Sequence, residues 1–131
     1  MSIHQQAMIA ADPAQVYAVL ADADALSALS GMRGVAARSA GEEFSAFDGH
    51  VIGRHIELVP DERIVQVWRF PQWEPGTYSI VRFSLVAEDG GSHLMLDQHG
   101  EPDDWHAHVD ANWPTFYLNP LTRHFSAQAV G

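Results

Sequence analysis

The sequence contains no cysteine, which excludes disulfide bonds and thiolate chemistry. This absence favours a reducing compartment, and we expect a cytoplasmic protein. Basic residues are also scarce, since 7 Lys and Arg stand against 17 Asp and Glu and give a net charge of −10. A charge of this size repels phosphate backbones and anionic lipid surfaces, so we expect neither a nucleic-acid nor a membrane partner.

Long hydrophobic runs are missing as well. No segment approaches the roughly 20 apolar residues that span a bilayer, and the start, MSIHQQAMIAADP, lacks the basic flank and apolar stretch of a signal peptide. The remaining composition, 47% hydrophobic and 18% charged over 131 residues, argues against disorder. Without an internal repeat or linker, the sequence predicts one domain over residues 1–131.

The N-terminal part predicts a strand followed by two short helices. Residues 3–11 carry apolar residues at mixed spacing, and we interpret them as an edge strand. Asp12 followed by Pro13 is typical of a helix start, with a carboxylate cap and proline in the first turn. The segment 22–31, DADALSALSG, predicts a second helix that ends at Gly31.

After residue 33 the apolar period becomes that of strands. The strand-like runs are GVAARSA (34–40), EEFSAF (42–47), HVIGRHIEL (50–58), RIVQVWRF (63–70), TYSIVRFSLVA (77–87) and HLMLDQH (93–99). Short Gly, Pro and Asp turns separate them, which predicts an antiparallel meander.

The segment 105–125 returns to a helical period. It carries a largely aromatic stripe at three- and four-residue spacings: Val109, Trp113, Phe116, Tyr117, Pro120, Leu121, His124 and Phe125. Pro114 predicts either a first-turn position after Asn112 or a kink in this helix, and Pro120 predicts a second kink. A long terminal helix is the expected cover for one face of the sheet.

Several runs resemble one known family. FDGHVIGRHIELVPDERIVQVWRF, GGSHLML and WPTFYLNPL are similar to the activator of heat-shock protein 90 ATPase homologue, C-terminal-domain type, of the START-like (SRPBCC) superfamily. The resemblance implies an α+β helix-grip fold, in which a curved, seven-stranded antiparallel sheet wraps a long C-terminal helix. Gln98 stands where this family commonly carries a histidine.

The resemblance also implies a cavity between sheet and helix. We expect it to bind a small, mainly apolar ligand without a cofactor. Two alternatives stay open: a co-chaperone-like interaction with a heat-shock protein 90 homologue, and a cyclase- or hydrolase-like enzyme that uses the same cavity. Strand parity and the helix stripe predict the lining residues Ile52, Arg54, Ile56, Gln66, Trp68, Val81, Phe83, Leu94, Leu96, Gln98, Trp113, Phe116, Tyr117 and Pro120.

Arg54 is the least expected residue of this set. If 52–58 and 64–70 pair with an even-sum register, its guanidinium shares a face with Gln66 and Trp68. An unpaired charge in a dry core is too costly, which favours a polar cavity floor with Trp68 as a cation–π partner. The alternatives are a bulge at Gly53, which turns Arg54 to solvent, and a buried salt bridge.

Catalytic and metal motifs are weak. His106, His108, Asp110 and His124 lack the spacing of a zinc site, so we expect no metal. We interpret the three histidines as surface residues. The carboxylate of Asp103 or Asp104 is expected to cap the last helix. No catalytic residue is assigned; His50, Arg54 and Tyr117 are the nearest candidates for acid–base work.

Trp73 lies in the Pro- and Gly-rich turn 70–78, where we expect a partly exposed ring. An exposed tryptophan of this kind marks an interface or a lid, and we expect a homodimer.

Overall fold

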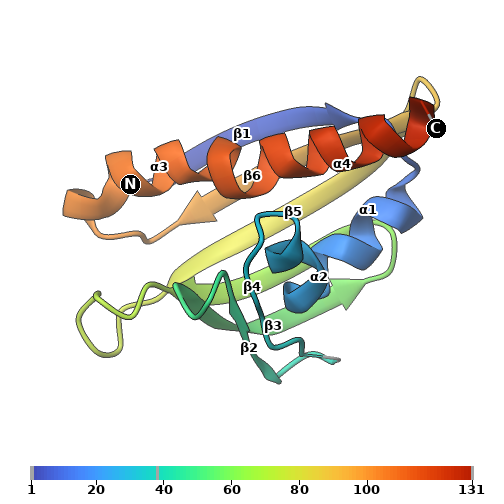
Figure 1. The fold of residues 1–131 in the computed structure, drawn as a ribbon. Helices are drawn as coiled ribbons and strands as arrows, with labels where there is room; N and C mark the ends of the chain where they lie inside the picture. The colour runs from blue at the N-terminus through green and yellow to red at the C-terminus, as the bar shows by residue number, and fades with distance from the viewer. Residues whose placement is uncertain (1, 38, 131) are drawn as a thin grey trace.

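The computed structural model describes residues 2–37 and 39–130, with side chains as far as Ser126. The elements in chain order are β1 (Ser2–Ile9), α1 (Pro13–Leu20), α2 (Ala23–Ala28), β2 (Glu43–Ala46), β3 (Val51–Val59), β4 (Arg63–Arg69), β5 (Ser79–Glu88), β6 (Gly91–His99), η1 (Asp103–Trp105), α3 (His106–Asn112), η2 (Trp113–Leu118) and α4 (Asn119–Val130). All strand pairs are antiparallel, in the order β1-β6-β5-β4-β3-β2. The C-terminal helix runs across one face of the sheet (Figure 1).

The sheet of the described residues has six strands, so the expectation of seven was wrong. In the run 34–40, of which Arg38 lies outside the described residues, only Val35 pairs with the sheet, through two hydrogen bonds with Ser45. Val35 is 65% exposed and Ala37 is buried in the core, but the described residues of this segment pair with the sheet only at the Val35 bridge. Gly34 passes so close to α2 that a Cβ would lie 2.4 Å from the Ala23 carbonyl oxygen.

The two short helices begin where the sequence predicts. The Asp12 side chain accepts a hydrogen bond from the Gln15 backbone N–H at 2.9 Å, and Pro13 is the first residue of α1. Asp22 caps α2 in the same manner by accepting from the N–H groups of Asp24 and Ala25. These caps satisfy N–H groups that have no partner inside the helix.

The C-terminal segment is helical throughout, as predicted, but its backbone changes type near Pro114. Residues Trp113–Leu118 form a π-helix, in which the N–H of Asn119 donates to the carbonyl of Pro114, five residues back. A proline inside a helix lacks its own N–H and collides with the carbonyl four residues before it. The wider π turn accommodates this without ending the helix.

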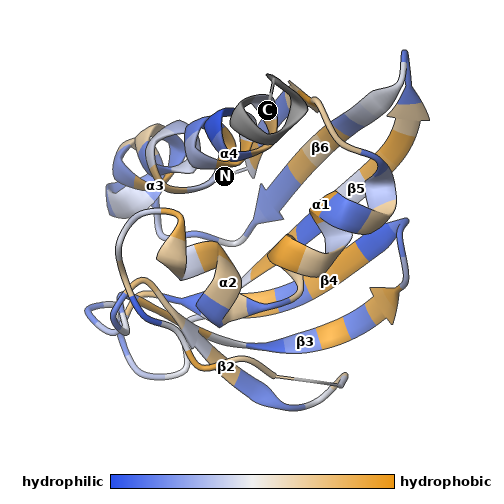
Figure 2. Ribbon diagram, turned by 45° about the vertical axis from the view of Figure 1, so that its right-hand side comes forward, coloured by the Kyte–Doolittle hydropathy of each residue, from blue (hydrophilic) through white to orange (hydrophobic). Residues whose placement is uncertain are grey.

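The hydrophobic core lies between the sheet and the helices, and Figure 2 shows the helices gathered on one side of the curved sheet. Its largest fully buried side chains include Trp68, Phe83, Leu94, Trp113 and Leu121. Within the described part of the chain, no helix has the length and apolar content to cross a bilayer.

Candidate functional site

A β-bulge at Ile56 decides which side chains of β3 face the helices. Near the turn, Leu58 pairs with Ile64, as the even-sum register requires. Beyond Ile56 the register shifts by one residue, so that Gly53 pairs with Trp68. One extra residue in a strand turns every following side chain to the opposite face.

This shift corrects three predicted lining residues. Ile52 and Ile56 point away from the helices, and Ile56 is 53% exposed. Arg54 also lies on the outer face, where its guanidinium donates to the Gly41 carbonyl at 3.0 Å and pairs with Glu43 at 3.4 Å. The polar cavity floor was therefore wrong. A bulge does turn Arg54 outward, but it lies at Ile56 and not at Gly53.

His55 takes the inward position that Arg54 was expected to occupy. Its ring is 1% exposed and stacks on Phe44, with 5.1 Å between the ring centroids. The Gln66 amide lies 3.4 Å from its Nδ1, and its Nε2 has no hydrogen-bond partner among the described residues. Burial lowers the pKa of His55, against weaker opposing effects of the Ala21 backbone and the Glu42 carboxylate.

Gln98 connects the C-terminal helix with three strands. Its Oε1 accepts from the Trp113 indole N–H at 2.8 Å, and its Nε2 donates to Ser79 Oγ at 2.9 Å. Ser79 in turn donates to the Trp68 carbonyl at 3.0 Å. Gln98 and Ser79 are fully buried, so this chain of hydrogen bonds satisfies polar groups that would otherwise destabilise the core.

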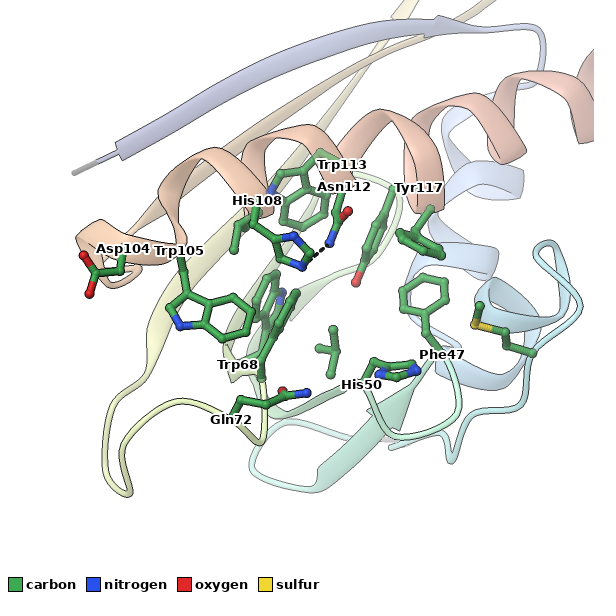
Figure 3. Close-up of a pocket in the computed structure, with 15 residues that line it drawn as sticks. Phe47, His50, Trp68, Gln72, Asp104, Trp105, His108, Asn112, Trp113 and Tyr117 are labelled. Carbon is green, nitrogen blue, oxygen red and sulfur yellow. Dashed lines mark hydrogen bonds between the residues drawn. The ribbon is translucent and has the colours of Figure 1, made fainter.

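A cleft of about 730 Å³ opens between the start of the C-terminal helix and the end of the sheet where β4 finishes (Figure 3). Its lining residues are Met32, Phe47, His50, Val51, Trp68, Phe70, Gln72, Asp104, Trp105, His108, Val109, Asn112, Trp113, Phe116 and Tyr117. Aromatic rings form much of the wall, and Tyr117 packs on Trp113 with 4.3 Å between centroids. The volume is in the usual range for small-molecule sites, about 300–1,000 Å³.

The predicted cavity residues divide into three groups. Trp68, Trp113, Phe116 and Tyr117 line the cleft. Val81, Phe83, Leu94, Leu96 and Pro120 are buried without lining it, and Gln66 and Gln98 are buried in the hydrogen bonds described above. Ile52, Arg54 and Ile56 lie on the opposite face of the sheet.

Some cleft residues were missed by sequence reasoning. His108 and Asn112 lie at four-residue steps before Phe116, on the same side of the helix, and this spacing itself would have revealed them. Gln72 comes from the loop after β4, where no periodic pattern marks it. The Asn112 amide donates to His108 Nε2 at 3.1 Å, which fixes that ring nitrogen as an acceptor.

The polar side chains of the described lining, apart from the tryptophans, are His50, Gln72, Asp104, His108, Asn112 and Tyr117. Figure 3 shows the Tyr117 hydroxyl pointing into the cleft, and burial raises the pKa of Tyr117, which keeps it a neutral donor. His50 and His108 are further lining groups, and among the described lining residues none is Arg or Lys. Of the three residues considered for acid–base work, His50 and Tyr117 share the cleft and Arg54 does not. The described residues contain no group of three His, Asp or Glu side chains arranged to hold a metal ion.

Trp73 closes one end of the aromatic wall from the loop after β4. Its ring is 3% exposed and packs against Phe70, with 5.6 Å between centroids, and against Trp68 at 6.0 Å. Arg69 donates to the Trp73 carbonyl and holds the loop in place. The expectation of a partly exposed ring was wrong, because the rings of Trp68, Phe70 and Trp105 pack around it, and Trp73 no longer argues for an interface.

Sequence comparison shows the family of the chain, and comparison with solved structures shows its fold. The family model described as "Activator of Hsp90 ATPase homolog 1-like protein" matches residues 10–126. The human "Activator of 90 kDa heat shock protein ATPase homolog 1" is 24% identical over 113 residues, 86% of this chain but 33% of its own length. The chain thus spans about a third of the curated relatives it matches.

Solved structures share the fold. A Plasmodium falciparum protein described as an HSP90 activator superposes with a TM-score of 0.83 at 23% identity, covering 91% of each chain. The Aha1 dimer from Colwellia psychrerythraea gives a TM-score of 0.73 at 20% identity, covering 88% of this chain and 90% of that one. With the family model matched over most of its length, the chain belongs to the Hsp90 ATPase activator homologue 1-like family and has its helix-grip fold.

Proposed function

We propose that this chain binds the heat-shock protein 90 homologue of its host and stimulates its ATPase. The observation that carries the proposal is the family match over residues 10–126, together with curated relatives named as activators of that ATPase. Those relatives are about three times as long as the matched region. The names of these relatives describe the activity of the full-length proteins. The proposal assigns the same activity to the single helix-grip unit that this chain shares with them.

The test is the ATP hydrolysis rate of the purified homologue with increasing amounts of the chain. We expect a saturable rise in rate, because an activator must bind the ATPase and favour its hydrolysis-competent state. The heat-denatured chain serves as the control for non-specific protein effects. An unchanged rate at saturating chain would refute the proposal.

The cleft supports a second candidate function, the binding of a small neutral aromatic or apolar ligand. The lining described above is largely aromatic, and the buried Trp68 indole N–H has no hydrogen-bond partner among the described residues. A ligand that carries an acceptor oxygen would satisfy such a group, whereas an anionic ligand finds no Arg or Lys in the described lining. A homodimer remains a separate proposal, supported by the dimeric Colwellia relative.

A neutral fluorescent probe, N-phenyl-1-naphthylamine, tests the cleft. We expect saturable binding, and Phe116→Ala should weaken it by about fivefold, since one aromatic contact contributes roughly 1 kcal/mol. Tyr78→Ala is the matched control, because Tyr78 is an exposed aromatic residue outside the cleft. Equal loss in both variants, or no binding by the wild type, would argue against ligand binding here.

A further inference from the structure

Figure 2 shows the helices on one side of the sheet, and strand pairing places a group of apolar and arginine side chains of the described residues on the other, outer face. The convex patch is defined by Ile52, Arg54 and Ile56 of β3, Val65, Val67 and Arg69 of β4, and Tyr78, Ile80 and Arg82 at the start of β5. Strand pairing places Ile52 beside Arg69, and Arg54 beside Val67 and then Ile80. The patch is thus a continuous surface across three strands.

Three of its apolar members are exposed, and Ile52, Val65 and Val67 are half-buried. Ile56, Tyr78 and Ile80 are 53%, 50% and 52% exposed, and they account for three of the six large hydrophobic residues recorded as exposed among the described residues. An apolar surface rimmed by charged groups is typical of an interaction site. A solvated sheet face usually carries polar side chains in these positions.

The charge of the patch is opposite to that of the whole chain. The net charge is −10, and all seven basic residues are arginines. Three of these, Arg54, Arg69 and Arg82, belong to the convex patch, and Arg63 lies at its border on β4. Glu43, Glu57 and Asp97 on the same face pair with Arg54, Arg63 and Arg82, so that Arg69 leaves the face with a small positive excess. An acidic partner is therefore repelled by most of the molecule but not by this face.

The three patch arginines are held in place before any partner arrives. Arg82 pairs with Asp97 at 3.2 Å, and the Arg69 guanidinium lies over the Tyr78 ring, 5.7 Å from its centroid. Arg54 is fixed by Glu43 and the Gly41 carbonyl. Side chains that are already ordered lose less conformational entropy on binding, and arginine with aromatic neighbours is frequent in the centres of interfaces.

We infer that the convex patch is the docking surface for an acidic, partly apolar face of a protein partner. This inference rests on the proposed function, and it assigns the patch as the face that the heat-shock protein 90 homologue contacts. The cleft opens on the helix side of the sheet, so that chaperone docking and ligand binding use opposite faces.

Calorimetric titration of the homologue with two matched variants tests the inference. Ile80→Glu puts a carboxylate in the middle of the patch and should weaken binding by about tenfold or more. Val86→Glu makes the same change on the same strand and face, at a residue that is 51% exposed but lies beyond the patch. It should bind like the wild type.

A charge reversal supplies a second test if Ile80→Glu fails to fold. Arg54→Glu should weaken binding several-fold, and the loss should shrink at high salt, where charge attraction is screened. The control is Arg123→Glu on the exposed side of α4. Unfolding midpoints of all four variants should stay close to that of the wild type.

The outcomes separate the two proposals. If the wild type does not bind the homologue, both are overturned. If it binds and the patch variants bind equally well, the docking surface is overturned while the proposed function stands. If sedimentation shows instead that Ile80→Glu dissociates a dimer of this chain without weakening chaperone binding, the patch joins two copies and the inference is wrong.

Discussion

At the scale of single residues, Gln98 shows how a polar side chain can be structural in this fold. Its side chain is fully buried between the Trp113 indole and the Ser79 hydroxyl, and both the oxygen and the nitrogen of its amide are hydrogen-bonded. Sequence reasoning grouped it with the cavity residues because its parity along β6 matches Leu94 and Leu96. The predicted inward direction of the Gln98 side chain was right. Its hydrogen-bond partners, however, come from other elements, so no pattern in the sequence around Gln98 indicates them.

Replacing Gln98 by Leu should destabilise the protein by about 2 kcal/mol, because the buried Trp113 N–H then has no acceptor. Urea unfolding measures the change. Gln6→Leu, at an exposed position on β1, is the control and should fall within roughly 0.5 kcal/mol of the wild type. Equal stability of both variants would mean that the hydrogen-bond chain contributes nothing.

His55 predicts how stability depends on pH. Burial lowers its pKa in the folded state below the ordinary value near 6.5, so that folding favours the neutral imidazole. Its contribution to stability is complete above about pH 6.5 and decreases as the pH falls from there toward the lower folded-state pKa. Unfolding free energies between pH 7.5 and 5 should therefore decline more steeply for the wild type than for His55→Gln. Parallel curves would contradict this role.

At the scale of elements, the sequence predicted where strands and helices lie better than how they face. The alternation of β4 is regular, and Ile64, Gln66, Trp68 and Phe70 point inward as expected. In β3 a single bulge at Ile56 reverses the following side chains. Nothing in HVIGRHIEL marks a bulge, because it is set by the pairing of two strands and not by the preference of one residue.

Gly53 shows a close approach rather than a bulge. A Cβ built there would lie 2.3 Å from the Val67 carbonyl oxygen and 2.6 Å from Trp68 Cβ. Gly53→Ala should therefore destabilise the protein by roughly 2–3 kcal/mol through overpacking. In Gly76→Ala, where φ is +86° and no atom lies near, backbone strain alone should cost about 1 kcal/mol. Thermal or urea unfolding that ranked the two variants in the reverse order would disprove the packing argument.

The C-terminal helix illustrates a prediction that held in position and changed in detail. The aromatic stripe correctly indicated one helix across the sheet, with Trp113 and Tyr117 buried. The proline at 114 indicated a kink, and the structure contains a π-helical turn. A kink and a π turn both accommodate the missing N–H of Pro114, and in the π turn Trp113 packs against Phe83 and Tyr117.

At the scale of the whole molecule, we assign different functions to the two faces of the sheet. The helix side holds the core and the cleft, and the outer side holds the convex patch. Family resemblance supplied the fold, whereas strand parity placed Ile52, Arg54 and Ile56 on the wrong side of the sheet. The position of these three residues on the outer face contradicts the predicted cavity lining, and it supports the inferred docking surface.

Methyl NMR of the six isoleucines tests this account most directly, because they divide between the two sides of the sheet. Ile52, Ile56 and Ile80 belong to the convex patch, whereas Ile3, Ile9 and Ile64 are buried in the core. Titration with the heat-shock protein 90 homologue should shift or broaden the three patch signals well before the three core signals. Spectra that do not change, or that change equally at all six methyl groups, would contradict docking through this face.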